Sequence, residues 1–193
     1  MIRVLRAMAA CLAVLVVAVH VAPWHSLMLP LHYNTSSSLP RGLYQATIVD
    51  TLRRGDILRV CVPEQVAPVA LARGYVGPGM CAGGTAPVGK VLAGVPGDTV
   101  HVDAKGIRIG SRLFVEAPIR KRDTRGRLIE GAQGMRVLGQ GECFVLSTYS
   151  RKSYDSRYFG PVRCMPPVLV LTPISAAARQ RLAAAEMLLQ EHE

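Results

Sequence analysis

The sequence predicts a mainly β domain, preceded by a short apolar segment and followed by a C-terminal helix. Eighteen glycines and 13 prolines interrupt the 193 residues, and they separate short apolar runs that have the length of strands. The chain is long enough to bury one core and too short for two large domains. We therefore expect a membrane anchor or signal segment at residues 1–29 and one folded domain at residues 30–193.

The N-terminal segment has the charge pattern of a membrane anchor. Arg3 and Arg6 precede an apolar run at residues 7–22, which contains one histidine and is ended by Pro23. A helix of this length rises about 24 Å, slightly less than the hydrocarbon core of a bilayer. The basic flank favours a cytoplasmic N-terminus, so the sequence predicts a single span in inner-membrane lipid and a periplasmic domain. The alternative is a cleaved signal peptide with residues 16–18 at its cleavage site.

The strands expected in the domain are short and separated by turn residues. A turn at residues 54–56 predicts that the first two strands pair as a hairpin. Residues 27–35 are expected to form an extended linker, and residues 119–141 lack periodicity and predict a loop. The expected strands are residues 43–49, 57–62, 90–94, 99–102, 107–109, 113–115, 143–148 and 168–171.

Two helices are expected. Residues 64–73 have the apolar spacing of a short helix, although Pro68 interrupts it. Ser175 is a suitable N-cap for a helix at residues 176–190, whose apolar side includes Leu182. We expect the C-terminal helix to pack on the edge of the sheet, and contact with a membrane surface is the alternative.

The cysteines indicate an oxidising compartment. Cys11 lies in the apolar segment, which leaves an even number of cysteines in the domain. Three pairings are possible, and the strand placement favours Cys61 with Cys81 and Cys143 with Cys164. Four buried free thiols are the alternative. Without Cys-x-x-Cys or His-Glu-x-x-His, the sequence predicts no metal and no cofactor.

A net charge of +10 raises the question of nucleic-acid binding. The basic residues are not interleaved with aromatic residues, and no helix-turn-helix pattern accompanies them. We therefore expect no nucleic-acid partner and instead a solvated loop that faces anionic lipid or an acidic partner. The residues in this stretch are Arg120, Lys121, Arg122, Arg125 and Arg127.

Three consecutive serines at residues 36–38 and one lysine, Lys90, are candidates for chemistry. Alone, the serines predict a polar linker and the lysine an exposed side chain. A serine hydroxyl becomes a good nucleophile only when an adjacent base takes its proton, and a lysine amine is such a base only when neutral. That requires the lysine pKa to fall by about 3 units through burial beside apolar residues.

Four blocks in order resemble the serine-lysine proteases of the type I signal peptidase superfamily: residues 34–44, 54–57, 89–100 and 153–160. The resemblance implies a signal-peptidase-like antiparallel β domain with Ser38 as nucleophile and Lys90 as general base. It further implies that Ser36 supplies an oxyanion-hole hydroxyl and that Ser153 orients the lysine. Asp155 would support the site by pairing with Arg157. In relatives, the matching aspartate has also been assigned a direct catalytic role.

Two departures from ordinary leader peptidases resemble the TraF-type conjugative transfer proteases. Leu39-Pro40 follows the nucleophile in place of methionine, and Ser150-Arg151-Lys152 replaces a Gly-Asp-Asn-Arg-Asp stretch. This resemblance implies that the substrate is the pilin precursor of a type IV secretion system, which TraF-type relatives mature and make cyclic. The alternatives are a general signal peptidase and a non-catalytic subunit of a secretion apparatus. A Ser-His-Asp triad is disfavoured because only His101 lies in the expected sheet.

Overall fold

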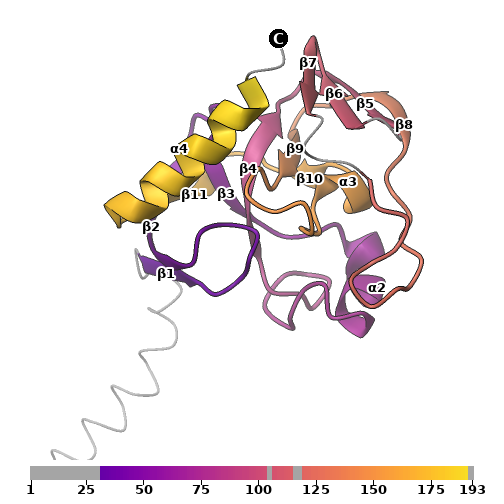
Figure 1. Ribbon diagram of the computed structural model, residues 1–193, viewed down its shortest axis with the longest axis horizontal. Helices are drawn as coiled ribbons and strands as arrows, with labels where there is room; N and C mark the ends of the chain where they lie inside the picture. Colours follow the sequence, from indigo (N-terminus) through magenta and orange to yellow (C-terminus); the bar gives the residue numbers. More distant parts are fainter. Residues whose placement is uncertain (1–30, 104–105, 115–118, 191–193) are drawn as a thin grey trace, which may run out of the picture. The chain divides into compact units, whose positions relative to one another are not determined.

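The computed structural model describes residues 31–103, 106–114 and 119–190 and confirms a mainly β fold (Figure 1). The expected anchor at residues 1–29 lies outside the described residues. Within the described part, no helix is long and apolar enough to cross a membrane. The chain divides into two units, residues 1–31 and 32–193, and the second contains almost all of the described elements.

Two sheets account for most of the second unit. The strands are β1 (Leu31–Asn34), β2 (Gly42–Val49), β3 (Ile57–Val60), β4 (Val88–Gly94), β5 (Thr99–Asp103), β6 (Gly106–Ile109), β7 (Arg112–Phe114), β8 (Gly134–Val137), β9 (Glu142–Leu146), β10 (Val162–Arg163) and β11 (Val168–Pro173). The larger sheet has the order β1-β2-β11-β3-β4-β9-β10, and the smaller has the order β7-β6-β5-β8. The pairings from β2 to β10 and within the smaller sheet are antiparallel, as expected.

The expected hairpin between the first two long strands is wrong. β11 lies between β2 and β3, pairing with β2 from Val168 opposite Val49 to Pro173 opposite Tyr44. On its other edge β11 pairs with β3. The local turn at residues 54–56 forms, but a strand more than a hundred residues later in the sequence takes the place beside β2. Long-range pairing therefore overrides the hairpin that the turn residues suggested.

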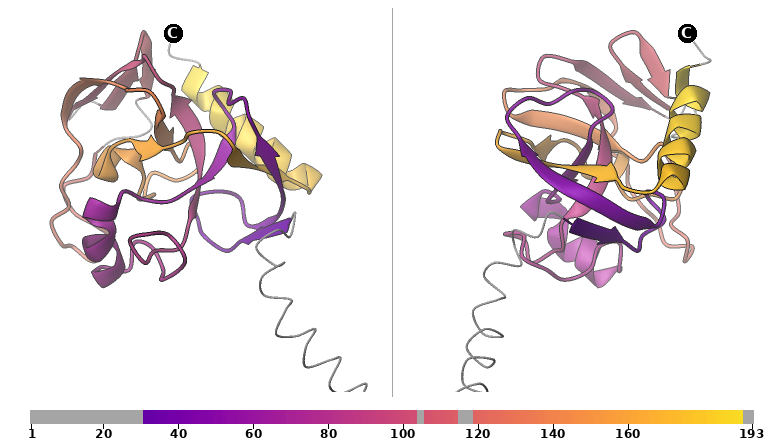
Figure 2. Two further views of the ribbon diagram at one scale, coloured as in Figure 1. Left: turned by 180° about the vertical axis from the view of Figure 1, so that it is seen from behind. Right: turned by 90° about the vertical axis from the view of Figure 1, so that its left-hand side faces the viewer.

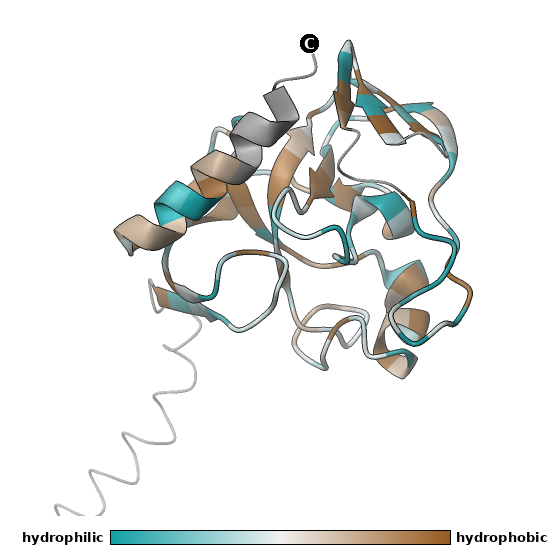
Figure 3. Ribbon diagram, in the orientation of Figure 1, coloured by the Kyte–Doolittle hydropathy of each residue, from teal (hydrophilic) through white to brown (hydrophobic). Residues whose placement is uncertain are grey.

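Three hydrophobic clusters fill the interior. One lies between the helices before β4 and the strands β3, β4 and β9, around Leu58, Leu92 and Val145. A second joins the smaller sheet to β9 through side chains such as Ile107 and Phe144. Because successive side chains point to opposite faces of a strand, Phe144 and Val145 serve different clusters. β9 thus contributes side chains to both clusters, in keeping with its mostly hydrophobic colouring in Figure 3.

The C-terminal helix forms where it was expected, but it packs elsewhere. α4 (Ala176–Gln190) begins after Ser175, whose hydroxyl accepts the Ala178 N–H at 3.1 Å. It lies against the interior strand β11 and not at the sheet edge (Figures 1 and 2). Leu182 joins the third cluster together with Leu171 and Tyr44.

Other short elements differ from the expectations. Residues 64–73 form a 3₁₀ turn, η1 (Glu64–Val66), followed by α2 (Ala67–Ala72), and Pro68 is accommodated in the first turn of α2. β1, β8 and β10 were not expected, and neither was the four-residue helix α3 (Ser156–Phe159). β8 is exposed along its whole length, which explains why it shows no apolar alternation.

The structure pairs the cysteines as the strand placement favoured. Cys61 bonds Cys81, which closes the segment that contains α2, and Cys143 bonds Cys164, which closes the segment that contains α3. Alkylation of the denatured, unreduced protein followed by peptide mapping should therefore label Cys11 alone. Crossed pairs would contradict the pairing. Four additional labelled cysteines would contradict the oxidising compartment as well.

Candidate active site

Lys90 is a charged residue in the middle of an apolar strand. It lies on β4 opposite Leu58 of β3 and shares its face with Leu92, while Val91 faces the other cluster. Only 3% of Lys90 is exposed. The Lys90 pKa is lowered from 10.5 to about 8, mainly by burial; the Asp155 carboxylate opposes the shift and Arg157 adds to it. The amine is therefore easier to deprotonate than an exposed lysine.

The loop that carries the three serines is tied down by Asn34, the last residue of β1. The Asn34 side-chain amide donates to the carbonyls of Leu39 at 3.0 Å and Pro40 at 3.2 Å. The Pro40 carbonyl also accepts the Tyr44 hydroxyl at 2.7 Å, and Leu39 is buried in the third cluster. Asn34 had no role assigned from the sequence, although it opens the first block. The loop is thus fixed by its backbone carbonyls and by one buried leucine.

Gly89 lets this loop approach β4 closely. A side chain at Gly89 would bring its Cβ within 2.9 Å of the Leu39 Cδ1 atom. Leu39 directly follows Ser38, and Gly89 directly precedes Lys90. The absence of a side chain at Gly89 therefore brings the serine and the lysine together.

Ser38, Lys90 and Ser153 meet at one point. Lys90 Nζ lies 2.6 Å from Ser38 Oγ and 2.7 Å from Ser153 Oγ, and the two hydroxyl oxygens are 3.1 Å apart. A neutral amine in this position can donate one N–H to Ser153 and accept the proton of the Ser38 hydroxyl. Ser153 thus occupies the position from which it was expected to orient the lysine. Among residues 36–38, the serine in contact with Lys90 is Ser38.

Ser36 lies beside the backbone of Ser38. Its Oγ accepts the Ser38 N–H at 3.4 Å and donates to Asn34 Oδ1 at 2.8 Å. The hydroxyl and the N–H that were expected to bind an oxyanion are therefore adjacent, but in this arrangement they face each other. The Ser36 hydroxyl must rotate away from Asn34 before both donors can address a substrate oxygen.

Asp155 and Arg157 form a fully buried ion pair. Asp155 Oδ1 accepts Arg157 Nε at 2.7 Å, Oδ2 accepts Arg157 Nη2 at 2.8 Å, and neither side chain is exposed. Arg157 also donates to the Ser153 carbonyl at 3.2 Å, and Asp155 caps the N-terminus of α3. The expected ion pair is therefore present, and it holds the segment that carries Ser153.

Ser147 is a site residue that the sequence did not reveal. Its hydroxyl donates to the Ser38 carbonyl at 2.6 Å, and its N–H donates to Asp155 Oδ2 at 3.0 Å. Ser147 thus connects the buried aspartate to the backbone of the candidate nucleophile. The sequence shows only a serine directly after the apolar strand β9, and a serine is also typical of an ordinary strand end. The burial of Ser147 is visible only in the structure.

The described residues contain no group of three or more His, Cys, Asp or Glu side chains close enough to hold a metal ion. The chemistry that the site can perform rests on the hydroxyl of Ser38 and the amine of Lys90. A hydroxyl in contact with a buried lysine of lowered pKa is the arrangement required for base-assisted attack on a carbonyl group.

Comparison with known proteins identifies the family. Residues 1–165 match the family described as "Signal peptidase, peptidase S26". The plasmid transfer protein TraF of Escherichia coli is 34% identical over 144 residues, which cover 73% of this chain and 80% of that protein. A conjugal transfer protein TraF of Agrobacterium fabrum is 36% identical over 134 residues, covering 67% and 73%.

A crystal structure of a signal peptidase I from Enterococcus faecalis V583 is also similar to this chain. It is 22% identical, with a TM-score of 0.35, and the match covers 62% of this chain and 95% of that one. The family match extends from the N-terminus through all four sequence blocks, and the TraF relatives independently exceed 30% identity over two thirds of the chain. This chain therefore belongs to the signal peptidase family, peptidase S26.

Proposed function

We propose that this protein is a membrane-anchored serine endopeptidase that matures the pilin precursor of a conjugation apparatus. The observation that carries the proposal is the 2.6 Å approach of Lys90 Nζ to Ser38 Oγ in a buried site. Membership of the signal peptidase family supports the reaction type, and the transfer-protein names of the relatives support the role in conjugation.

In the proposed reaction, Lys90 Nζ takes the proton of the Ser38 hydroxyl while Oγ attacks the scissile carbonyl carbon. The tetrahedral intermediate collapses when Lys90 returns that proton to the leaving amine, which gives an acyl-enzyme on Ser38 and a free amino terminus. The Ser38 N–H and the Ser36 hydroxyl are the proposed donors to the oxyanion. Ser153 holds the amine in place, and Asp155 acts through Arg157 and Ser147.

The proposed location is the periplasmic face of the inner membrane. Two disulfides support an oxidising compartment for the domain, and the basic flank of the expected anchor supports a cytoplasmic N-terminus. An anchored enzyme would meet a membrane-inserted precursor near the bilayer surface.

The pH dependence follows from the lowered pKa of Lys90. Only the neutral amine can accept the serine proton. The cleavage rate should therefore rise with pH and level off once the pH exceeds the Lys90 pKa of about 8. At pH 6 the rate should be about one hundredth of the plateau. The rate of the purified, detergent-solubilised enzyme measured from pH 6 to about 10 tests this. A flat profile would argue against Lys90 as the base.

The product distinguishes maturation of a pilin from removal of a leader peptide. The acyl-enzyme can be resolved by water, or by the amino terminus of the same substrate if it is held close, since a tethered amine can reach effective concentrations of about 10⁵ M. Co-expression with the pilin gene of the same genetic element should yield a pilin that is one water lighter than the linear peptide and resists amino-terminal sequencing.

A linear product with a new free amino terminus, cut after an N-terminal leader, would instead identify a general signal peptidase. Unchanged precursor in the presence of the wild-type protein would favour the non-catalytic subunit. Co-expression of the Ser38→Ala variant is the control in each case, because processing that persists in it comes from another enzyme of the host.

A further inference from the structure

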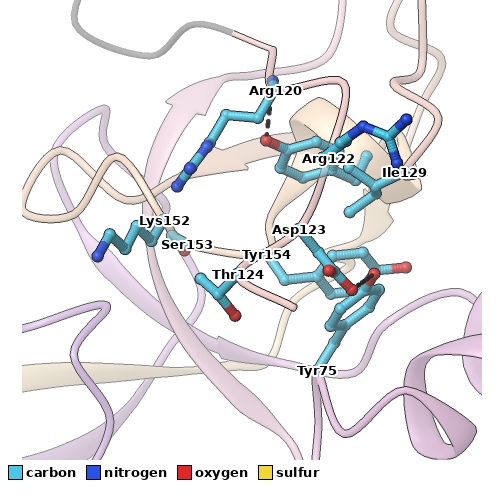
Figure 4. A pocket seen from close by; sticks show the side chains of 10 residues that line it. Tyr75, Arg120, Arg122, Asp123, Thr124, Ile129, Lys152, Ser153 and Tyr154 are labelled. Atoms are coloured by element: carbon cyan, nitrogen blue, oxygen red, sulfur yellow. Dashed lines mark hydrogen bonds between the residues drawn. The ribbon is translucent and has the colours of Figure 1, made fainter. Parts of the chain in front are cut away.

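A small pocket adjoins the candidate active site on the side of Ser153. Its cavity volume is about 60 Å³, and its walls come mainly from the loop after β7 and the segment before α3, together with Tyr75 and Tyr158 (Figure 4). Ser153 lines this pocket and also contacts Lys90 and Ser38. A liquid water molecule occupies about 30 Å³, so the pocket has room for one small polar group. Because Ser153 Oγ lies 3.1 Å from Ser38 Oγ, a peptide bound at Ser38 would lie near this pocket.

The pocket is lined by an excess of positive charge. Three of its side chains are cationic, Arg120, Arg122 and Lys152, and one is anionic, Asp123. Arg122 lies at the outer rim, where it donates to the Gly126 carbonyl at 2.7 Å. Arg120 extends toward the part of the pocket where Ser153 lies, and the Lys152 side chain extends outward from beside Ser153 (Figure 4).

The single carboxylate of the pocket already has partners. Asp123 accepts the Tyr75 hydroxyl at 2.8 Å, Arg127 Nε at 2.7 Å, and the N–H groups of Arg125 and Arg127 at 2.8 and 2.9 Å. Arg127, which lies outside the pocket, thus balances its charge. These hydrogen bonds fix the loop. They also occupy the carboxylate oxygens of Asp123, so that Asp123 does not neutralise the other cations of the pocket.

The charged ends of Arg120 and Lys152 have no carboxylate partner among the described residues, although their backbones are fixed. The Arg120 N–H donates to the Tyr158 hydroxyl at 3.2 Å, and Lys152 precedes the buried Ser153. Two cations without a carboxylate partner beside a small, partly enclosed space give that space a charge that attracts an anion. A guanidinium binds a carboxylate with two parallel N–H groups, and an ammonium adds a point charge.

We propose that this pocket binds a carboxylate of the peptide that is being cleaved, and that Arg120 and Lys152 make the enzyme selective for it. The proposal rests on the proposed peptidase function. The carboxylate is either the side chain of an Asp or Glu near the scissile bond or the C-terminal carboxylate of a short peptide that leaves. Both sources present the same group, and free probes distinguish them.

Binding is tested without turnover, on the isotope-labelled full chain in detergent micelles. Four probes are compared by NMR: N-acetylglutamate, N-acetylglutamate α-amide, N-acetylglutamine and N-acetylglutamine amide. The first three carry a carboxylate and the last carries none. The amide signals of Arg120, Lys152 and Ser153 should shift with a probe that carries the right carboxylate, and should not move with N-acetylglutamine amide. A shift with the α-amide indicates side-chain recognition, and a shift with N-acetylglutamine indicates C-terminal recognition.

Variants locate the binding to the pocket. Arg120→Gln and Lys152→Gln should each weaken binding of the carboxylate probe by about tenfold or more, because a charge-assisted hydrogen bond is lost. Lys121→Gln is the matched control, since it removes one exposed charge from the same loop outside the pocket. Equal effects of all three variants, or no shift with any carboxylate probe, would overturn the proposal. Stronger shifts with glycerol phosphate than with every carboxylate would do so too, because they would indicate a lipid-headgroup site.

Selectivity is then tested with mixtures of random-sequence peptides, one mixture amidated and one with free C-termini. Mass spectrometry of the wild-type products should show enrichment of Asp and Glu at one position, or of cuts at a fixed distance from a free C-terminus. Lys152→Glu should remove that enrichment and favour Lys or Arg there. If the wild-type products show no such enrichment and the Lys152→Glu variant cuts the same peptides, the proposed selectivity is wrong. If wild-type and Ser38→Ala proteins yield the same products, the proposed function fails, while the probe titrations still decide on the pocket.

Discussion

The Ser38→Ala variant is expected to leave the pilin precursor entirely unprocessed, and Lys90→Met should lower processing by about 10²- to 10⁴-fold. The first change removes the atom that attacks, and the second removes the base that lies 2.6 Å from it. Intact mass of the co-expressed precursor measures both effects. Ser37→Ala is the matched control, because Ser37 is exposed beside Ser38 and should retain normal activity.

Loss of folding cannot imitate this result, because Lys90→Met is expected to stabilise the domain at neutral pH. A pKa lowered from 10.5 to about 8 corresponds to a penalty of about 3 kcal/mol on the charged amine. This penalty lowers the free energy of unfolding of the wild type below pH 8 and disappears as the pH rises toward 10.5. The difference in stability between Lys90→Met and the wild type should therefore shrink over that interval. Denaturant unfolding at pH 7 and at pH 10 measures this difference.

Lys90→Arg separates the role of the base from the role of positive charge. A guanidinium stays protonated at every working pH, so this variant should be inactive even though it keeps the charge. Full activity in Lys90→Arg would contradict the serine-lysine mechanism. Activity that survives in Ser38→Ala but disappears in Ser36→Ala would move the nucleophile to Ser36.

The second large effect is expected from Asp155→Ala, which should destabilise the domain by about 3–5 kcal/mol. The change leaves the guanidinium of Arg157 buried without its carboxylate, and it leaves the Ser147 N–H without its acceptor. Because small domains are stable by only about 5–15 kcal/mol, a large share of the protein should then unfold or be degraded. Denaturant unfolding and protease resistance, measured at pH 7, test this.

Asp155→Asn distinguishes support of the site from a direct part in the chemistry. The amide oxygen can still accept one of the hydrogen bonds, so the variant should lose less stability than Asp155→Ala. If Asp155 acts through Arg157 and Ser147, activity should fall in step with stability. A variant that is as stable as the wild type but inactive would assign Asp155 a direct catalytic role. Ser147→Ala should lower the catalytic rate with a smaller loss of stability, because it frees the Ser38 carbonyl.

The individual strands were predictable where one face of the strand is buried and the other is not. Alternation placed β5 and β6 within one residue of their observed bounds, because each contributes apolar side chains to the cluster around Ile107. The same reasoning failed for β8, whose side chains are all exposed, and for α3, which is too short to show a helical period. Pairing partners were harder still, since the turn before β3 favoured β2 and gave no indication of β11.

The sequence by itself determined the class of fold and the family, favoured the two disulfide pairs, and named Ser38 and Lys90 through the resemblance to that family. These features depend on local patterns, on cysteine order and on blocks of matching residues. Only the tertiary structure placed the Ser38 hydroxyl 2.6 Å from Lys90 Nζ, linked Asp155 to the Ser38 backbone through Ser147, and brought cations together beside Ser153. The physical reason is that Ser38 and Lys90 are 52 positions apart and Ser38 and Ser147 are 109 positions apart. These distances arise only when β4, β9 and the serine loop pack together.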